Sequence, residues 1–274
     1  MTYVSNINFG SYLAGLWEGD GHLSMPRPKD RYNPRWCITF HSRDVALAEV
    51  LKRKLGGFIR HKVKNNACVL VVSTVPGLKA VLKTTHGQYR SPKLRSVNRL
   101  ITWLNTHHNA NLPYETELKT SLRTNAWLAG FIDADGSFGV RFTRQTASQK
   151  CRISCRFRLE QRMVDPVSSE SYQALMLSLT QMLDVNLKKR KQNTGRSYFL
   201  VESSSIQSNT KLVSYLNHYN LFSSKKHNYD LWCRVHAKLK FKLAYVEPYI
   251  KEIEIIKLNI NKNPEICIQN LKKL

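Results

Sequence analysis

The sequence contains one nine-residue stretch twice: Leu-Ala-Gly-Leu-Trp-Glu-Gly-Asp-Gly at 13–21 and Leu-Ala-Gly-Phe-Ile-Asp-Ala-Asp-Gly at 128–136. The copies lie 115 residues apart, which is the length of an ordinary domain. Each copy is apolar and rich in small residues until it ends on an acid followed by glycine. This pattern predicts a buried helix that ends at the acid in each half of the chain.

Small residues recur four positions apart in both copies, as Gly15 and Gly19 in the first and as Gly130 and Ala134 in the second. Residues i and i+4 share a helix face, so each helix presents a stripe with little side chain. Two backbones can approach closely along such stripes. We therefore expect the two helices to pack together and to bring their last turns side by side.

Each predicted helix ends on an acid, Asp20 or Asp135, and packing would place the two carboxylates together. Both would face the negative end of a helix dipole, which is costly unless cations lie between them. Hard divalent ions such as Mg²⁺ take oxygen ligands and suit two-metal cleavage of a phosphodiester. Gly21 and Gly136 fit the left-handed position just past a helix end. The alternative is two buried helices whose acids only cap or face solvent.

The composition limits the class of partner. The 274 residues include 43 Lys and Arg against 19 Asp and Glu, giving a net charge of +24 and a pI near 10.0. This excess indicates a polyanion, usually nucleic acid, with an anionic membrane surface as the alternative. The six cysteines show no disulfide framework, and no stretch resembles a membrane span or a targeting signal. We therefore expect a reducing compartment and action where the protein is made.

The same order of elements is predicted twice, as a helix, two strands, a helix, two strands and further helices. After the first motif we expect strands at 22–27 and 35–41, a helix at 44–55, strands at 58–64 and 67–73, and helices at 76–85 and 93–105. After the second we expect strands at 138–143 and 151–160, a helix at 169–183, strands at 185–191 and 197–203, and helices at 206–219 and from 225. The tail from 246 to 274 is either an extra helix or a loose arm.

The predicted fold class is α+β, with two pseudo-twofold-related αββαββα units packed through the motif helices. Each unit has one antiparallel sheet, and the sheets form a basic saddle for DNA. We expect an N-terminal half-domain at 1–110, a linker at 111–123, and a C-terminal half-domain with an extension at 124–274. The polar segment 105–121, which contains His107 and His108, is interpreted as solvated linker rather than as a metal site.

Strand alternation predicts that basic and hydroxyl side chains share the outward sheet faces, where Cys37 is also expected. A solvated basic face is the alternative, but the net charge favours contact with a DNA groove. About half of the outward residues would contact bases and the rest phosphates. The predicted DNA-binding residues are Ser24, Arg35, Thr39, Arg60, Lys62, Arg141, Thr143, Arg152, Ser154, Arg156, Arg158, Lys188 and Arg190.

The repeated stretch resembles the motif of the LAGLIDADG homing endonucleases in their single-chain, two-motif form. The second copy matches almost letter for letter, whereas Trp17 and Glu18 replace Ile and Asp in the first. The resemblance implies that Asp20 and Asp135 are metal ligands, one for each DNA strand, with the backbone carbonyls of Gly19 and Ala134 assisting. The cofactor implied is Mg²⁺, with Mn²⁺ able to substitute and Ca²⁺ supporting binding without cleavage.

The family also keeps a basic residue near the cleaved phosphates. Ser91-Pro92-Lys93 and Ser223-Ser224-Lys225 each open a late helix, which makes Lys93 and Lys225 the candidates. Simple phosphate anchoring is the alternative role. The alternative residues are Arg90, Arg95 and Lys226.

A polar residue, often Gln, tends to end the second strand in this family. Gln161 fits and could orient a metal-bound water, but Phe40 stands at the matching place in the first half. The resemblance therefore implies two non-equivalent sites that cut the strands at different rates. Glu18 and Asp133 are interpreted as groups at the helix ends that support the ligands, with solvated carboxylates as an equal alternative.

The resemblance implies a monomeric DNA endonuclease that cuts both strands of a long asymmetric site across the minor groove and leaves 3′ overhangs. Such enzymes are commonly encoded in organellar introns, and the Asn- and Lys-rich tail fits a mitochondrial or chloroplast gene. Two alternatives stay open: an intron RNA maturase, alone or as a second activity, and a DNA-binding protein that does not cleave.

Overall fold

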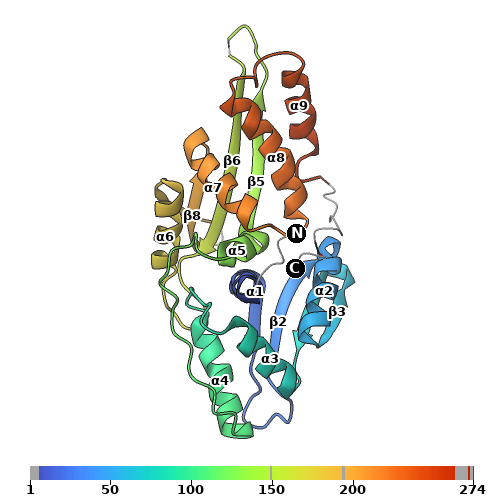
Figure 1. Cartoon of the computed structure of the whole chain (residues 1–274), viewed down its shortest axis with the longest axis vertical. Coiled ribbons are helices and arrows are strands. Elements are labelled where there is room, and N and C mark those ends of the chain that lie inside the picture. Colours follow the sequence, from blue (N-terminus) through green and yellow to red (C-terminus); the bar gives the residue numbers. More distant parts are fainter. Residues whose placement is uncertain (1–5, 149, 193–194, 263–270, 272–273) are drawn as a thin grey trace.

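The computed structural model describes residues 6–148, 150–192, 195–262, 271 and 274. Two similar halves lie end to end, and the motif helices α1 (Asn6–Asp20) and α5 (Trp127–Asp135) lie side by side between them (Figure 1). The predicted α+β architecture with two antiparallel sheets is confirmed.

The first half contains a four-stranded antiparallel sheet in the order β1-β2-β4-β3. Its helices cover the apolar face of the sheet, because the alternating strands bury one set of side chains. After α1 the elements are β1 (Gly21–Ser24), β2 (Arg35–His41), a 3-10 turn η1 (Ser42–Asp44), α2 (Val45–Leu55), β3 (Phe58–Lys62), a 3-10 turn η2 (Val63–Asn65), β4 (Ala67–Val72), α3 (Val75–Thr85) and α4 (Leu94–His108).

The second half repeats this plan with the strand order β5-β6-β8-β7. Its elements after α5 are β5 (Gly136–Thr143), β6 (Arg152–Arg162), α6 (Gln173–Leu183), β7 (Leu187–Lys191), β8 (Ser197–Ser203), α7 (Ile206–His218), α8 (Lys225–Lys240) and α9 (Tyr249–Asn259). The described part of the tail thus includes a further helix, α9, which packs against α8 and β5.

The strand registers make the two halves directly comparable. Gly21 pairs with Ile38 in the first sheet, and Gly136 pairs with Leu159 in the second. Counting two residues onward along β2 and β6 places Phe40 at the position of Gln161. One large hydrophobic core runs through both halves and includes the two motif helices.

Several predicted boundaries were wrong for local reasons. The first strand ends at Ser24 rather than at 27, because Pro26 and Pro28 cannot extend a ladder. The helix predicted from 169 begins at Gln173, after a turn held by Asp165. The strand predicted from 185 begins at Leu187.

The helix predicted at 93–105 ends later than expected. Helix α4 continues to His108, so His107 and His108 belong to its last turn and not to a loop. Both imidazole rings lie against Trp103, with ring centroids 5.0 and 4.9 Å away. Aromatic contact therefore keeps this polar sequence helical.

Cys37 lies on the outward sheet face, as predicted, but among apolar rather than polar neighbours. It is buried and forms a small apolar cluster with Val69 and Val71. The five described cysteines are unpaired, and Cys267 lies outside the described residues. Within the described part of the chain, no helix is long and apolar enough to cross a membrane.

Candidate active site

The two motif helices touch at backbone distance along their small residues. A Cβ added to Gly15 would lie 1.9 Å from the carbonyl oxygen of Trp127, and one added to Gly130 would lie 2.0 Å from that of Tyr12. These two contacts are equivalent in the halves, which shows the pseudo-twofold relation at atomic level. The predicted packing of the stripes is confirmed.

Closer to the site, a Cβ on Gly19 would lie 2.1 Å from the Cβ of Ala134 and 3.0 Å from Asp135 Oδ2. The ends of the two helices therefore meet, as expected. Only a residue without a side chain allows the first helix to end so close to the acid of the second.

The glycines after the acids have a different role from the one predicted. Gly136 has φ −74° and ψ 154°, an extended conformation that begins strand β5, and Gly21 likewise begins β1. Neither is left-handed. A Cβ on Gly21 would lie 2.2 Å from the Trp17 ring, and one on Gly136 would lie 2.6 Å from the Ile132 side chain. Lack of space, rather than backbone conformation, requires glycine at both positions.

Asp20 and Asp135 form an electrostatically coupled pair. Part of Asp20 is open to solvent and Asp135 is half-buried, but the crowded ends of the two helices remove much of the water around both carboxylates. Loss of surrounding water and then the charge of Asp135 raise the pKa of Asp20 to about 7, against the opposing effect of Lys225 and Lys93. Burial likewise raises the pKa of Asp135 above its usual range. The ionised form of each carboxylate is therefore disfavoured in the metal-free protein, as expected of a site that binds cations.

The donor atoms at this site suit a hard divalent cation. Two carboxylates and the adjoining helix-end carbonyls offer only oxygen, and Mg²⁺ completes its shell with water and phosphate oxygens. Among the described residues, no group of three or more His, Cys, Asp or Glu side chains could hold a metal by itself.

Lys93 and Lys225 reach the last turns of the motif helices in their own halves. Lys93 Nζ donates to the carbonyl oxygens of Gly19 at 2.7 Å and Gly21 at 2.8 Å. Lys225 Nζ donates to those of Ala134 and, at 3.3 Å, Ile132. The carbonyls predicted to assist a metal are thus already in contact with a lysine ammonium group.

Burial lowers the pKa of Lys93, whereas Asp135, Glu18 and Asp20 raise it in opposition. A cation at the C-terminus of a helix also interacts favourably with the dipole. Both lysines therefore lie where they could act on a phosphate bound at the acids.

The alternative basic residues are engaged elsewhere. The guanidinium of Arg90 donates to the carbonyl oxygens of Leu118 and Thr120 and so fixes the linker. Lys226 pairs with Asp230 one turn along α8. These contacts leave Lys93 and Lys225 as the better candidates.

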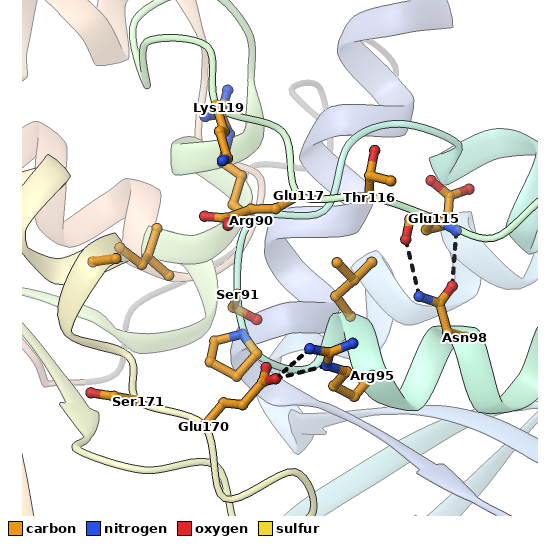
Figure 2. A pocket seen from close by; sticks show the side chains of 14 residues that line it. Arg90, Ser91, Arg95, Asn98, Glu115, Thr116, Glu117, Lys119, Glu170 and Ser171 are labelled. Carbon is orange, nitrogen blue, oxygen red and sulfur yellow. Dashed lines mark hydrogen bonds and ion pairs between the residues drawn. The ribbon is translucent and has the colours of Figure 1, made fainter.

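Arg95 pairs with Glu170 of the second half at 2.7 Å. Figure 2 shows this pair at the edge of a cavity of about 460 Å³ between α4, the linker and the segment before α6. Across the cavity, Asn98 holds the backbone of Glu115 in the linker. The cavity thus lies where the halves and the linker are joined, away from the paired acids.

Glu18 and Asp133 are not solvated, contrary to one of the two readings of the sequence. Both are buried, with 0% and 4% of their surface exposed. Glu18 accepts from the backbone N–H groups of Arg90 and Ser91, and from Trp127 Nε1 at 2.6 Å. Burial raises the pKa of Glu18 to about 7 against these hydrogen bonds.

Asp133 makes the equivalent contacts in the other half. It accepts from Phe222 N at 2.7 Å, Ser223 Oγ at 2.5 Å and Tyr12 OH at 2.7 Å. Each acid thus fixes the chain before the lysine of its own half and binds a side chain of the other half's motif helix. This exchange was not predicted, although the apolar neighbours of both acids could have indicated burial.

Two cavities flank the acids, one for each half. The larger, about 400 Å³, is lined by Lys93, Asp135, Gln161 and Asp165 among others. Gln161 Nε2 donates to Asp135 Oδ2 at 2.7 Å. The smaller, about 250 Å³, is lined by Lys225 with residues from the end of β2.

These cavities are related by the pseudo-twofold axis, but their polar groups differ. Where Gln161 contacts an acid in one, Phe40 stands at the equivalent strand position and is buried. The smaller cavity is lined instead by His41 and Arg43. The two cavities therefore differ in their polar groups, and a difference in the cleavage of the two strands stays a prediction.

The predicted DNA-binding residues lie together on the outward faces of the two sheets, as the registers require. In the first sheet Thr39 pairs with Val69, which pairs with Arg60. In the second, Arg141 pairs with Ser154 and Thr143 pairs with Arg152. Contact with DNA itself stays a prediction.

The ion pairs that acidic residues form on this outward face were not predicted. Glu202 lies between three of the predicted DNA-binding cations, at 2.6 Å from Arg158, 3.1 Å from Lys188 and 3.6 Å from Arg156. Glu160 on the same face pairs with Arg190 at 3.1 Å. The second sheet therefore carries an ordered network of charges and not simply a row of free cations.

Comparison with known proteins agrees with this description. Residues 128–236 match the family model described as LAGLIDADG endonuclease. The solved structure of the meganuclease I-AabMI bound to uncleaved DNA superposes with a TM-score of 0.68 at 23% identity, covering 92% of this chain and 99% of that one. The meganuclease I-SmaMI bound to uncleaveable DNA gives 0.68 at 17% identity, with 94% and 99% covered.

Curated relatives come from fungi. An uncharacterized cox1 intron-2 protein of Schizosaccharomyces pombe is 26% identical over 92% of this chain and 72% of its own length. The intron-encoded DNA endonuclease aI3 of Saccharomyces cerevisiae is 26% identical over 82% of this chain and 62% of its own. The intron-encoded RNA maturase bI4 of the same yeast is 27% identical over 51% of this chain, which spans only 20% of that protein.

The fold and the paired helix-end acids define a two-unit α+β protein built around one shared, oxygen-rich site. Within that class, residues 128–236 match the LAGLIDADG endonuclease family, and the repeated stretch gives this chain two copies of the motif in one polypeptide.

Proposed function

We propose that this protein is a monomeric, site-specific endonuclease that cleaves both strands of double-stranded DNA with a divalent metal. The observation that carries the proposal is the pairing of Asp20 with Asp135 at the meeting point of the motif helices, flanked by a lysine from each half. Both acids of the motif are retained, and the outward sheet faces on either side carry the cations that a phosphate backbone needs.

The metal is proposed to be held by Asp20 and Asp135, with Gly19 and Ala134 offering their carbonyl oxygens. When bound, Mg²⁺ would neutralise phosphate charge and lower the pKa of water. Lys93 and Lys225 would stabilise negative charge that develops on the phosphates. Gln161, which donates to Asp135, would hold that carboxylate and a water in position on its side.

Recognition is proposed to use the outward residues of both sheets. Because the two halves carry different side chains, the preferred site would be long and asymmetric. The first sheet has an apolar patch around Cys37, whereas the second has the charge network around Glu202. Half-sites of different sequence are therefore expected.

The direct test is cleavage of a duplex that spans the insertion site of the host gene with its intron removed. With Mg²⁺ or Mn²⁺ we expect a staggered break with 3′ overhangs in both strands, because each acid would serve one strand. With EDTA no cutting is expected, and with Ca²⁺ binding alone. Tight binding without a break in any of these metals would reject the endonuclease.

Glu202 offers a second test, directed at DNA recognition. Glu202→Gln would release Arg156, Arg158 and Lys188 from their shared partner. We expect affinity for random duplex at low salt to rise by about tenfold, with a steeper salt dependence. Filter binding across a salt series on target and random duplexes measures both effects.

Glu252→Gln is the matched control, because Glu252 also lies between two cations, Arg234 and Lys238, but on helix α9. The same change removes one negative charge there. An equal gain in both variants would show that net charge, and not the outward face, causes the effect.

A second candidate activity is favoured by the match to the RNA maturase bI4. We propose it only as an additional role, because both acids of the motif are retained. Binding of the host intron RNA by Asp135→Asn protein would support it, whereas RNA binding no tighter than that of an unrelated intron would exclude it. The relative named for a cox1 intron also supports an intron-encoded protein that acts in the mitochondrion.

A further inference from the structure

Asp44 stands where it would be expected to cap helix α2, yet it does not. It is the N-cap residue of α2, and its side chain makes no hydrogen bond to that helix. Asp at this position normally accepts from the N–H groups of its own first turn. The carboxylate of Asp44 is instead buried and turned toward the other half of the molecule.

The partner of Asp44 is the residue that begins helix α8. Asp44 Oδ1 accepts from Ser224 N at 2.6 Å, and Oδ2 accepts from Ser224 Oγ at 3.2 Å. Ser224 is the N-cap residue of α8 and makes no cap of its own there. An acid from the first half thus caps a helix of the second, where its negative charge favours the positive end of the dipole.

The first side chain of that helix belongs to the proposed site. Lys225 follows Ser224 directly, and its Nζ reaches the carbonyl oxygen of Ala134 beside Asp135. Any shift of the Ser224 backbone would move Lys225, since the two are adjacent in the chain. Asp44 also adds to the charges that raise the pKa of Asp20, after burial and Asp135.

Asp165 of the second half makes no equivalent contact with the start of helix α4 in the first half, for a chemical reason. Asp165 corresponds to Asp44, but its Oδ2 accepts from Val167 N, Ser168 N and Ser168 Oγ in its own loop. The residue that corresponds to Ser224 is Pro92, which has no N–H to donate. The start of the helix that follows Lys93 is therefore not capped by an aspartate from the other half.

We propose that Asp44 is a positioning residue that sets Lys225 for cleavage of one DNA strand, with no counterpart for Lys93. The inference rests on the proposed endonuclease function. Because only one of the two lysines depends on a capping acid from the other half, loss of Asp44 should slow one strand selectively. The two halves of the site would then differ in a second way, besides the difference between Gln161 and Phe40.

The test measures single-turnover cleavage of each strand separately, on target duplex with a different label on each strand. Lys225→Ala and Lys93→Ala first identify the strand that depends on each lysine. Asp44→Ala should then slow the Lys225-dependent strand by about tenfold, as expected for a displaced catalytic group, and leave the other within about twofold. Nicked duplex of one polarity should accumulate.

Ser224→Pro removes the donor instead of the acceptor. The backbone of Ser224, with φ −56°, accepts proline, and the first half already contains Ser91-Pro92-Lys93. This variant should show the same selective loss as Asp44→Ala. The double variant should lose no more than either single one, because both remove one interaction. Asp44→Asn, which keeps an acceptor for the Ser224 N–H, should recover most of the rate.

Asp165→Ala is the matched control and should not slow the Lys225-dependent strand. A loss shared equally by both strands in Asp44→Ala, with a lower melting temperature, would overturn the proposal by showing a purely structural role. Selective loss on the Lys93-dependent strand would also overturn it. Wild-type protein that cuts neither strand in Mg²⁺ would overturn the proposed endonuclease itself, and this inference with it.

Discussion

Asp135→Asn should abolish double-strand cleavage of the target duplex, and Asp20→Asn should do the same. Each change keeps the size of the side chain but removes the charge that holds a divalent cation. We expect the rate on the strand that each acid serves to fall by at least about 10²-fold to 10³-fold, the cost of losing a main stabiliser of transition-state charge. Mg²⁺-dependent cleavage under single-turnover conditions measures it.

The same variants should bind target duplex as tightly as the wild type in Ca²⁺, or more tightly. Burial and then the charge of Asp135 raise the pKa of Asp20, so removing one of the two negative charges relieves repulsion in the metal-free protein. Gln161→Ala is the comparison for the weaker, orienting contact to Asp135. Unchanged cutting of both strands by Asp135→Asn would remove this acid from the mechanism.

Much of the fold could be predicted because its information is local. The small-residue stripe of the motif determines which helices meet, and it needs only Gly15, Gly19, Gly130 and Ala134. Strand alternation then gives the faces of the sheets. Boundaries failed where a local exception intervened, as at Pro26, where the strand had already ended.

The supporting contacts of the site could not be predicted, because their partners are remote in the sequence. Asp44 meets Ser224 180 residues later, and Glu18 meets Trp127 109 residues later. Nothing local distinguishes an aspartate that caps its own helix from one that caps another. Glu202 was missed for the same reason, because its cations come from two neighbouring strands.

Gly21 is needed for a different physical reason from the one that its place after a helix predicts. The sequence rule that glycine follows a helix in the left-handed conformation is sound in general, but here strand β1 begins at once and the chain is extended. The requirement for glycine comes from the ring of Trp17 packed above it. The residue was therefore correctly singled out, and the physical reason given for it was wrong.

Gly15→Ala should destabilise the protein more than alanine at any other described glycine of the first half. Its Cβ would lie 1.9 Å from the carbonyl oxygen of Trp127, and that atom is backbone, so α1 and α5 must separate. We expect a loss of about 3 kcal/mol or more in the free energy of unfolding, at the upper end for overpacking. Gly130→Ala should behave alike, because its Cβ would lie 2.0 Å from the carbonyl oxygen of Tyr12. Urea denaturation measures both losses.

Gly139→Ala is the control for the added methyl group, since nothing lies within 4 Å of its Cβ position. In a strand, alanine in place of glycine also restricts the unfolded chain, so stability should stay level or rise slightly. If Gly15→Ala were as mild as Gly139→Ala, the helices could not be in backbone contact. Asp20 and Asp135 would then be too far apart to share cations, so this measurement of stability also tests the geometry on which the proposed chemistry depends.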